Sequence, residues 1–174
     1  MQIDVCLIVE CAIVGSGTEL PYLQQLSREL GLDDYITFTG FQSGQPLLRA
    51  LSAFDVGVIP DPKNTYNDKI SMNKVFEYMS LGIPFVQFDL IEGRKIADDA
   101  ALYAHDNDPD DLARVMGELI DSPSLRAQLT NSGQTRAKAL LRWDAESDRL
   151  LSAYQAALTG PRRARQPSSV PATK

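Results

Sequence analysis

A polar loop that runs into an amphipathic helix carries the residues best suited to chemistry in this sequence. The segment from Pro60 to Pro84 reads PDPKNTYNDKISMNKVFEYMSLGIP, and its helical part is predicted to begin near Ser71. We expect Ser71 to be the N-cap, because a serine hydroxyl accepts hydrogen bonds from backbone N–H groups of a first turn. The other free N–H groups of that turn, flanked by Lys69 and Lys74, form an anion site that suits a sugar-nucleotide diphosphate.

Glu77 lies further along the same expected helix and is suited to binding hydroxyl groups. The apolar face of this helix has the spacing i, i+3, i+4, i+7 and consists of Met72, Val75, Phe76 and Met79. Because successive helical residues are about 100° apart, Glu77 lies beside this stripe and can face a cleft. Its carboxylate can then accept two hydrogen bonds from vicinal ribose hydroxyls. The alternative is a solvent-exposed Glu77 that pairs with Lys74 three positions earlier.

A short glycine motif, Gly15-Ser16-Gly17, follows an apolar run and precedes a helical pattern. A dinucleotide-binding fingerprint at this place would have its third glycine at position 20, where the sequence has Leu20. Two interpretations therefore stay open. The motif is either a tight strand-to-helix turn that glycine's backbone freedom explains by itself, or such a turn that also approaches a phosphate.

The composition argues against several classes of protein. The 174 residues include 17 basic and 23 acidic side chains, and the net charge of -6 argues against a nucleic-acid partner, which would require a basic face. The most apolar stretch, residues 5–14, is far shorter than the roughly 20 residues that span a membrane. His105 is the only histidine, so we expect no metal site. Cys6 and Cys11 lie in one apolar run, and we expect a reduced, cytoplasmic setting.

Strand-like and helix-like patterns alternate along residues 1–159. Strands are expected at 5–14, 35–39, 55–59 and 84–88, and helices at 23–30, 47–54, 72–79 and 112–120, with further helical stretches to 158. This alternation predicts an α/β fold with a doubly wound parallel sheet and a helical C-terminal end. Ligands bind such sheets at the carboxyl ends of the strands, where the loops 15–20, 40–44 and 60–71 lie. Residues 160–174 are predicted to be a disordered basic tail, either solvated or touching an anionic membrane surface.

Three further side-chain patterns carry structural expectations. Residues 5–14 form an almost continuous apolar run, which predicts a strand buried on both faces. Trp143 and Tyr154 are expected to pack the C-terminal helices together. The charged residues that follow the strand at 84–88 are expected to lie near the cleft; they are Asp89, Glu92 and Arg94.

Several of these segments together resemble the donor-binding half of the retaining glycosyltransferases of family 4. The resemblance covers residues 12–158 and rests on Gly15-Ser16-Gly17, Phe38-Thr39-Gly40, residues 55–60, residues 74–84 and residues 144–154. The helix with the glycine and proline that follow it, residues 74–84, is the most specific part. The resemblance implies the Rossmann-like half of a GT-B fold, a nucleoside diphosphate sugar as donor substrate, and neither a metal ion nor another cofactor.

The resemblance also implies roles for single residues. The family has a pair of glutamates on this segment. The second matches Glu77, which would hold the nucleotide ribose, and the first falls on Lys69, a departure from the family pattern. The turn that surrounds the donor sugar and phosphate matches the backbone amides of Ile70, Ser71, Met72 and Asn73, with Lys69 and Lys74 as neighbouring cations. The loop that reads the base matches Phe41 and Gln42, and the strand-to-helix turn matches Gly15 and Gly17.

Enzymes of this kind have an acceptor domain before the donor domain, and a first donor-domain strand and helix that bring cations to the diphosphate. The sequence resembles neither part, so we expect residues 1–159 to be a nucleotide-sugar-binding domain truncated at its N-terminus. By itself this domain would bind the donor but would not transfer the sugar. In the whole enzyme the sugar would pass to a glycan or lipid-linked acceptor. The isolated domain could also self-associate through an uncovered sheet edge. The alternatives are a non-catalytic nucleotide- or protein-binding module and a nucleotide-sugar epimerase of the same architecture.

Overall fold

A computed structural model describes residues 9–160 of the chain. Its strands are β1 (Cys11–Val14), β2 (Ile36–Gly40), β3 (Gly57–Ile59), β4 (Phe85–Phe88) and β5 (Ala101–Ala104). Its α-helices are α1 (Leu20–Glu29), α2 (Gly44–Leu51), α3 (Asn73–Leu81), α4 (Ile91–Ala97), α5 (Pro109–Asp121), α6 (Pro123–Leu140) and α7 (Trp143–Thr159). Two 3-10 turns, η1 (Asn67–Lys69) and η2 (Asp98–Ala100), interrupt the loops. The predicted alternation is confirmed, with β5 and α4 as additions, whereas residues 161–174 of the predicted tail lie outside the described residues.

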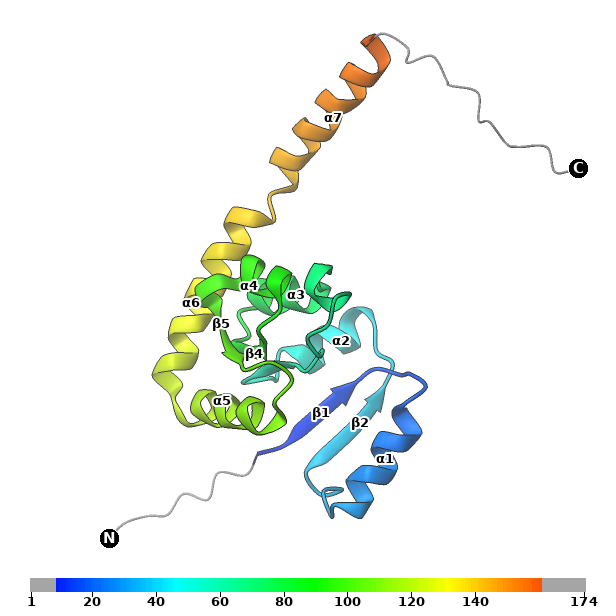
Figure 1. Cartoon of the computed structure of the whole chain (residues 1–174), viewed down its shortest axis with the longest axis vertical. Coiled ribbons are helices and arrows are strands. Elements are labelled where there is room, and N and C mark those ends of the chain that lie inside the picture. The colour runs from blue at the N-terminus through cyan, green and yellow to red at the C-terminus, as the bar shows by residue number, and fades with distance from the viewer. Residues whose placement is uncertain (1–8, 161–174) are drawn as a thin grey trace, which may run out of the picture.

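The α/β fold with parallel strands is confirmed, but the described strands lie in two sheets rather than one. One sheet has the order β1-β2 and the other the order β3-β4-β5, and every paired strand runs parallel to its neighbour (Figure 1). Each parallel pair is joined by a helical crossover, because a short turn cannot return the chain to a parallel start.

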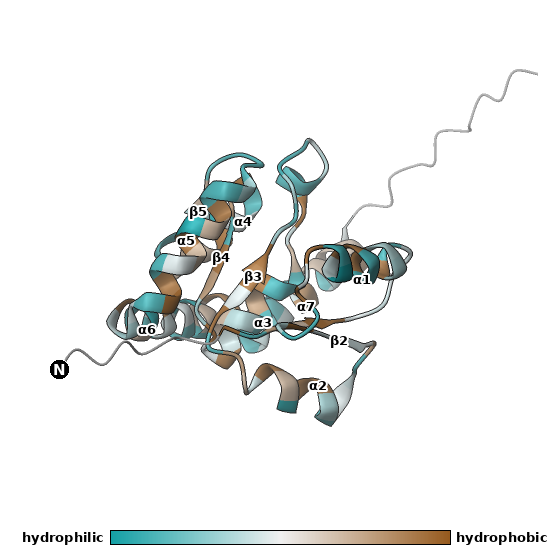
Figure 2. Cartoon of the chain, turned by 90° about the horizontal axis from the view of Figure 1, so that it is seen from below, coloured by the Kyte–Doolittle hydropathy of each residue, from teal (hydrophilic) through white to brown (hydrophobic). Residues whose placement is uncertain are grey.

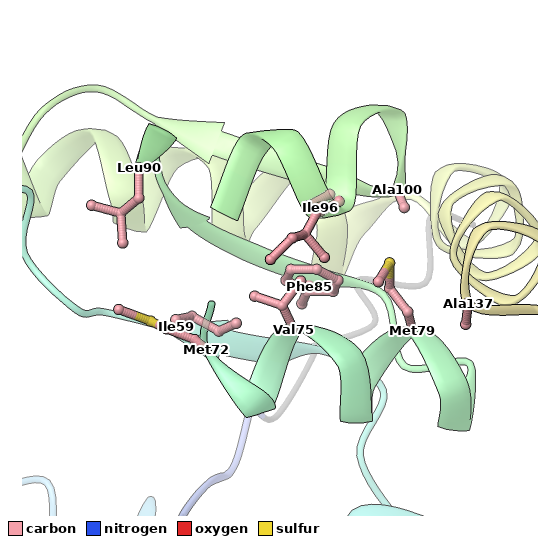
Figure 3. Close-up of a cluster of buried hydrophobic side chains, with 11 residues drawn as sticks. Ile59, Met72, Val75, Met79, Phe85, Leu90, Ile96, Ala100 and Ala137 are labelled. Carbon is pink, nitrogen blue, oxygen red and sulfur yellow. The ribbon is translucent and has the colours of Figure 1, made fainter. Parts of the chain in front are cut away.

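The hydrophobic core lies on both faces of the sheet β3-β4-β5. Phe85 of β4 packs with α3, α4 and α6, whereas Val86 and Phe88 pack with α5 on the opposite face. Successive residues of a strand point to opposite faces, so β4 is buried along its whole length. Figure 3 shows the first cluster around Phe85, and Figure 2 shows β3 in the hydrophobic colour with hydrophilic loops beyond its end. No described helix is long and apolar enough to cross a membrane.

The first part of the described chain, from β1 to α2, has little core of its own. Within residues 9–54 only Ser27 and Leu51 are buried. The prediction of a strand at 5–14 buried on both faces is wrong for the described part, because Cys11 and Ala12 are exposed. Residues 1–8 lie outside the described part. The physical reason for the exposure of β1 is that neither hydrophobic core cluster includes a residue of this strand, so no packed side chains cover its faces.

The two C-terminal helices differ in how they are held. Helix α6 packs against α3, where Gly133 lies against Met79 and the Thr130 hydroxyl donates a 3.0 Å hydrogen bond to the Gly82 carbonyl oxygen. Helix α7 projects away from the rest of the domain (Figure 1), and none of its described residues is buried. The predicted packing of Trp143 and Tyr154 is therefore wrong, since these side chains are 70% and 62% exposed.

Gly82 ends α3 in a left-handed conformation, with φ 74°. A Cβ atom added at Gly82 would lie 2.5 Å from Nε2 of Gln134 on α6. We predict that Gly82→Ala lowers the free energy of unfolding by about 1–2 kcal/mol, because an L-residue is strained in this backbone region and Gln134 must move. Urea unfolding followed by circular dichroism measures the change. Gly117→Ala, where an added Cβ meets no atom within 4 Å, is the control; an equal loss at both glycines would contradict the prediction.

Candidate functional site

The predicted site residues lie at the carboxyl ends of strands β1, β2 and β3. Gly15 and Gly17 follow β1, Phe41 and Gln42 follow β2, and the loop after β3 leads through residues 60–72 into α3. The residues at the ends of β1 and β2 form one group, and those between β3 and α3 form a second. Among the described residues no hydrogen bond or ion pair joins the two groups. The contacts that position the second group therefore come from the loop after β3 and from α3, and not from the first group.

Helix α3 begins without a side-chain cap. Its N-cap is Met72, which has an extended backbone, and no side chain accepts a hydrogen bond from the first turn. The prediction that Ser71 is the N-cap is wrong, because the helix starts at Asn73 and Ser71 lies one residue too early and is exposed. Met72 is 8% exposed and packs in the core, so its burial fixes where the helix begins. The first turn therefore keeps backbone N–H groups that no capping side chain satisfies.

An ion pair links the loop to this helix. The Lys74 ammonium group contacts the Asp61 carboxylate, thirteen positions earlier. The Lys74–Glu77 pair of the alternative interpretation is therefore wrong, whereas the solvent-exposed Glu77 of that interpretation is confirmed. Glu77 is exposed and makes no ion pair within the described part of the chain, so its carboxylate can accept hydrogen bonds from a ligand.

The pKa of Tyr78 is affected by the carboxylates of Glu77 and Asp61. Burial raises the pKa of its hydroxyl, and the negative charges of Glu77 and Asp61 raise it further. The ring packs against Phe85 with centroids 5.7 Å apart, and it covers Gly57, where an added Cβ would lie 2.6 Å from the ring. Tyr78 therefore fixes the helix that carries Lys74 and Glu77 against β3 and β4.

The loop between β3 and α3 is held by its own polar side chains, which sequence reasoning missed. The Asn64 carboxamide oxygen accepts hydrogen bonds from the backbone N–H groups of Tyr66 and Asn67, at 3.0 and 2.9 Å. The Asp68 carboxylate accepts one from the N–H of Ile91, at 3.1 Å, and so fastens η1 to α4. The signal for these roles is the density of Asn and Asp in the loop, since their side chains bond to nearby backbone. Lys69 stays exposed at the end of η1.

A separate pocket of about 380 Å³ lies at the carboxyl ends of β4 and β5. Asp89 and Arg94 form an ion pair in its wall, and Lys63 pairs with Asp106 at 2.9 Å. Glu92, which was expected with Asp89 and Arg94 near the ligand cleft, pairs with Lys95 at 3.1 Å and does not line this pocket. None of the predicted donor-binding residues lines this pocket. The described residues hold no cluster of three or more metal-ligating side chains.

Tyr103, in the wall of this pocket, gives a pH-dependent prediction. Burial raises the pKa of its hydroxyl to about 12, although the Arg94 guanidinium group, 3.8 Å from the ring centroid, acts in the opposite direction. Because the folded chain holds this proton more tightly than the unfolded chain, the stabilisation is present below about pH 10 and is lost as the pH rises towards 12. We predict that Tyr103→Phe lacks this loss. Urea unfolding of both chains between pH 9 and 11 tests it; a difference in stability that is independent of pH would contradict it.

The structure is a parallel α/β domain with an uncapped helix start after the carboxyl end of β3, the end of the sheet at which such folds bind ligands. Comparison with known proteins then gives the family. The sequence profile described as Glycosyl transferases group 1 matches residues 4–122, and the chain belongs to this family.

Named relatives and solved structures agree with this assignment. D-inositol 3-phosphate glycosyltransferase of Thermomonospora curvata is 34% identical over 148 residues, which are 82% of this chain and 32% of the relative. HepE of Anabaena, solved with UDP-glucose, aligns with a TM-score of 0.68 at 17% identity, over 85% of this chain and 41% of HepE. The C-terminal domain of LpcC, a glycosyl transferase group 1 protein of Francisella tularensis, aligns with a TM-score of 0.62 at 18% identity, over 77% of this chain and 70% of that domain. The chain spans about a third of the length of the curated relatives.

Proposed function

We propose that this chain is the C-terminal, donor-binding domain of a retaining family 4 glycosyltransferase and binds a nucleoside diphosphate sugar. One observation carries the proposal: Lys74 is paired with Asp61, so Glu77 is left free beside an uncapped helix start. The free carboxylate suits a ribose, and the helix start suits the diphosphate. The alignments with the LpcC C-terminal domain and with HepE in its UDP-glucose complex support the domain assignment and make UDP the first nucleotide to test.

The chemistry proposed for this site needs no metal ion or other cofactor. Retaining transfer requires that the leaving diphosphate be stabilised as its charge develops. We propose that the amides of Ile70, Ser71, Met72 and Asn73, with Lys69 and Lys74, do this. Glu77 would bind and orient the nucleotide. Gly15 and Gly17, with Phe41 and Gln42, are proposed to complete the site at the phosphate and the base.

The acceptor is proposed to be a glycan or lipid-linked molecule, held by the part of the enzyme that this chain does not span. A relative named for lipopolysaccharide core biosynthesis supports that class, whereas the relatives named for D-inositol 3-phosphate favour a small phosphorylated acceptor. We propose that the chain alone binds the donor but does not transfer the sugar. A cytoplasmic location, with the basic tail at the inner membrane face, is part of the same proposal. Residues 161–174 of the tail lie outside the described residues.

Calorimetric titration with UDP, GDP and ADP, and then with their sugars, tests the proposal. We predict saturable binding of one nucleotide, weakened about 5- to 150-fold in Glu77→Ala, the range that corresponds to 1–3 kcal/mol for lost hydrogen bonds to a charged group. Glu77→Gln, which keeps one acceptor, should lie between the two. Glu118→Ala removes a carboxylate from α5 and serves as the matched control. An affinity unchanged in Glu77→Ala would exclude the ribose role.

A second candidate is a non-catalytic nucleotide-binding module, which Lys69 favours. An exposed cation stands where the family has the glutamate that contacts the donor sugar. The same titration distinguishes the two candidate functions. A donor domain should bind UDP-glucose or another UDP sugar differently from UDP, whereas a module that does not recognise the sugar should bind both with equal affinity.

A further inference from the structure

The loop between β3 and α3 is positioned by polar contacts rather than by packing. From residue 62 to residue 69 it contains no buried side chain. Asp61 pairs with Lys74 of α3, and the Asp68 carboxylate accepts a hydrogen bond from the Ile91 N–H group of α4. Because no buried apolar side chain anchors the stretch between these two contacts, its conformation depends on the hydrogen bonds that it makes with other parts of the domain.

Asn107 supplies another attachment of this loop, from the turn between β5 and α5. Its carboxamide oxygen accepts a hydrogen bond from the Lys63 N–H group, and its Nδ2 atom donates one of 3.0 Å to the Lys63 carbonyl oxygen. One side chain therefore pairs with both backbone polar groups of a residue 44 positions away in the sequence. The Lys63 ammonium group also pairs with the neighbouring Asp106 at 2.9 Å. These contacts fasten the loop to the turn at residue 63.

The turn that carries Asn107 is itself held by α5. Asp108 is the N-cap of this helix and accepts hydrogen bonds from the N–H groups of Asp110 and Asp111. The Asp111 carboxylate accepts one from the His105 N–H group, at 2.7 Å. Asn107 has a left-handed backbone with φ 54°, which asparagine tolerates better than most residues do. Since α5 packs in a core cluster, Asn107 lies on a firmly held part of the domain.

The attachment at residue 63 leads directly into the proposed donor site. The Asn64 carboxamide oxygen accepts hydrogen bonds from the N–H groups of Tyr66 and Asn67, and the Asn64 carbonyl oxygen accepts one from the N–H group of Asp68, at 3.0 Å. Residue 64 thus organises η1, and residues 70–73 follow it into α3. A displacement of residue 63 would therefore be passed through Asn64 to the amides proposed to bind the diphosphate.

We propose that Asn107 is a positioning residue for nucleotide-sugar binding, an inference that rests on the proposed function. By pairing with the Lys63 backbone, it holds the loop in the conformation that presents Lys69 and the amides of residues 70–73 to the diphosphate. Asn107 raises the fraction of chains in which the loop is competent to bind, and the apparent affinity is proportional to that fraction. Its loss should therefore weaken binding of a nucleoside diphosphate and of the corresponding sugar by the same factor.

The first measurement is hydrogen exchange of the full chain without a nucleotide. Asn107→Gly removes the carboxamide and introduces a residue that adopts a positive φ without strain. The amides of Lys69 and Ile70 donate to the Tyr66 and Asn67 carbonyl oxygens and do not bond to Asn107. We expect them to exchange at least about fivefold faster in the variant, with β4 unchanged. Unchanged exchange at both amides, or faster exchange in β4 as well, would overturn the positioning role.

The second measurement is calorimetric titration with UDP and UDP-glucose, or with the GDP or ADP pair if that nucleotide binds the unmodified chain. We expect Asn107→Gly to weaken both ligands about 5- to 20-fold, because two solvent-exposed hydrogen bonds are lost. Asn107→Asp keeps an acceptor for the Lys63 N–H group and should lie between. Arg126→Ala is the matched control, because Arg126 donates to the Leu119 and Ile120 carbonyl oxygens at the other end of α5. It should lower stability but leave the affinity within about twofold.

The outcomes distinguish this inference from the proposed function. If the unmodified chain binds none of the three nucleotides, the donor function fails and the positioning role fails with it. If the chain binds one of them and Asn107→Gly binds it equally well, the donor function stands and the positioning role is overturned. The same conclusion follows if Arg126→Ala weakens binding as much as Asn107→Gly does.

Discussion

Phe85→Ala is expected to be among the most destabilising single substitutions in the chain, with a loss of about 3–5 kcal/mol in the free energy of unfolding. Phe85 is fully buried in the central strand β4 and packs against Tyr78 of α3, with a tilt of 50° between the rings. Removing its ring leaves a cavity between β4 and α3 that the neighbouring helices cannot fill without moving. Urea unfolding followed by circular dichroism measures the loss.

The matched control is another aromatic residue of the same chain. Trp143 lies at the start of α7 and is 70% exposed, so Trp143→Ala should change the free energy of unfolding by less than about 0.5 kcal/mol. If both substitutions cost the same, or if Phe85→Ala costs less than about 1 kcal/mol, the core does not lie where the structure places it.

The sequence could predict the part of the fold in which one face of each element is apolar. Helix α3 is an example, because the spacing of Val75, Phe76 and Met79 specifies it, and the strand predicted at 84–88 is confirmed as β4. The burial of β4 on both faces was not predicted, since its sequence includes Gln87. The division of the described strands into two sheets could not be predicted, because the pattern of a single strand does not indicate which other strand lies beside it. The exposed Trp143 shows the same limit, since an aromatic side chain alone does not indicate what will cover it.

For the candidate site the sequence indicates residue types but not their contacts, and the roles of those residues stay predictions. The lysines and Glu77 were recognised by their spacing around a helix start, yet the partner of Lys74 is Asp61, in the loop before the helix. Spacing within a helix indicates partners three or four residues away, whereas a loop can bring a more distant residue into contact. The helix start was wrong for a similar reason, because burial of Met72, rather than a hydroxyl cap at Ser71, determines where α3 begins.

Lys74→Glu is expected to weaken nucleotide binding by about 100-fold or more. The substitution removes a charge-assisted hydrogen bond to the diphosphate, and it places a carboxylate beside Asp61 and Glu77 at a site that must hold an anion. Calorimetric titration with the nucleotide that binds the unmodified chain measures the effect. Lys95→Glu reverses a charge on α4, where Lys95 pairs with Glu92, and should leave the affinity within about twofold.

A charge swap separates the two roles of Lys74. Combining Asp61→Lys with Lys74→Asp keeps an ion pair between the loop and α3 but moves the cation from the helix start to the loop. If Lys74 acts on the diphosphate directly, the swap should recover the stability that Lys74→Glu loses while binding stays weak. Full recovery of binding would mean that the pair only holds the loop in place. The direct role is favoured because the Lys74 side chain is 45% exposed, so it is accessible to a ligand while it contacts Asp61.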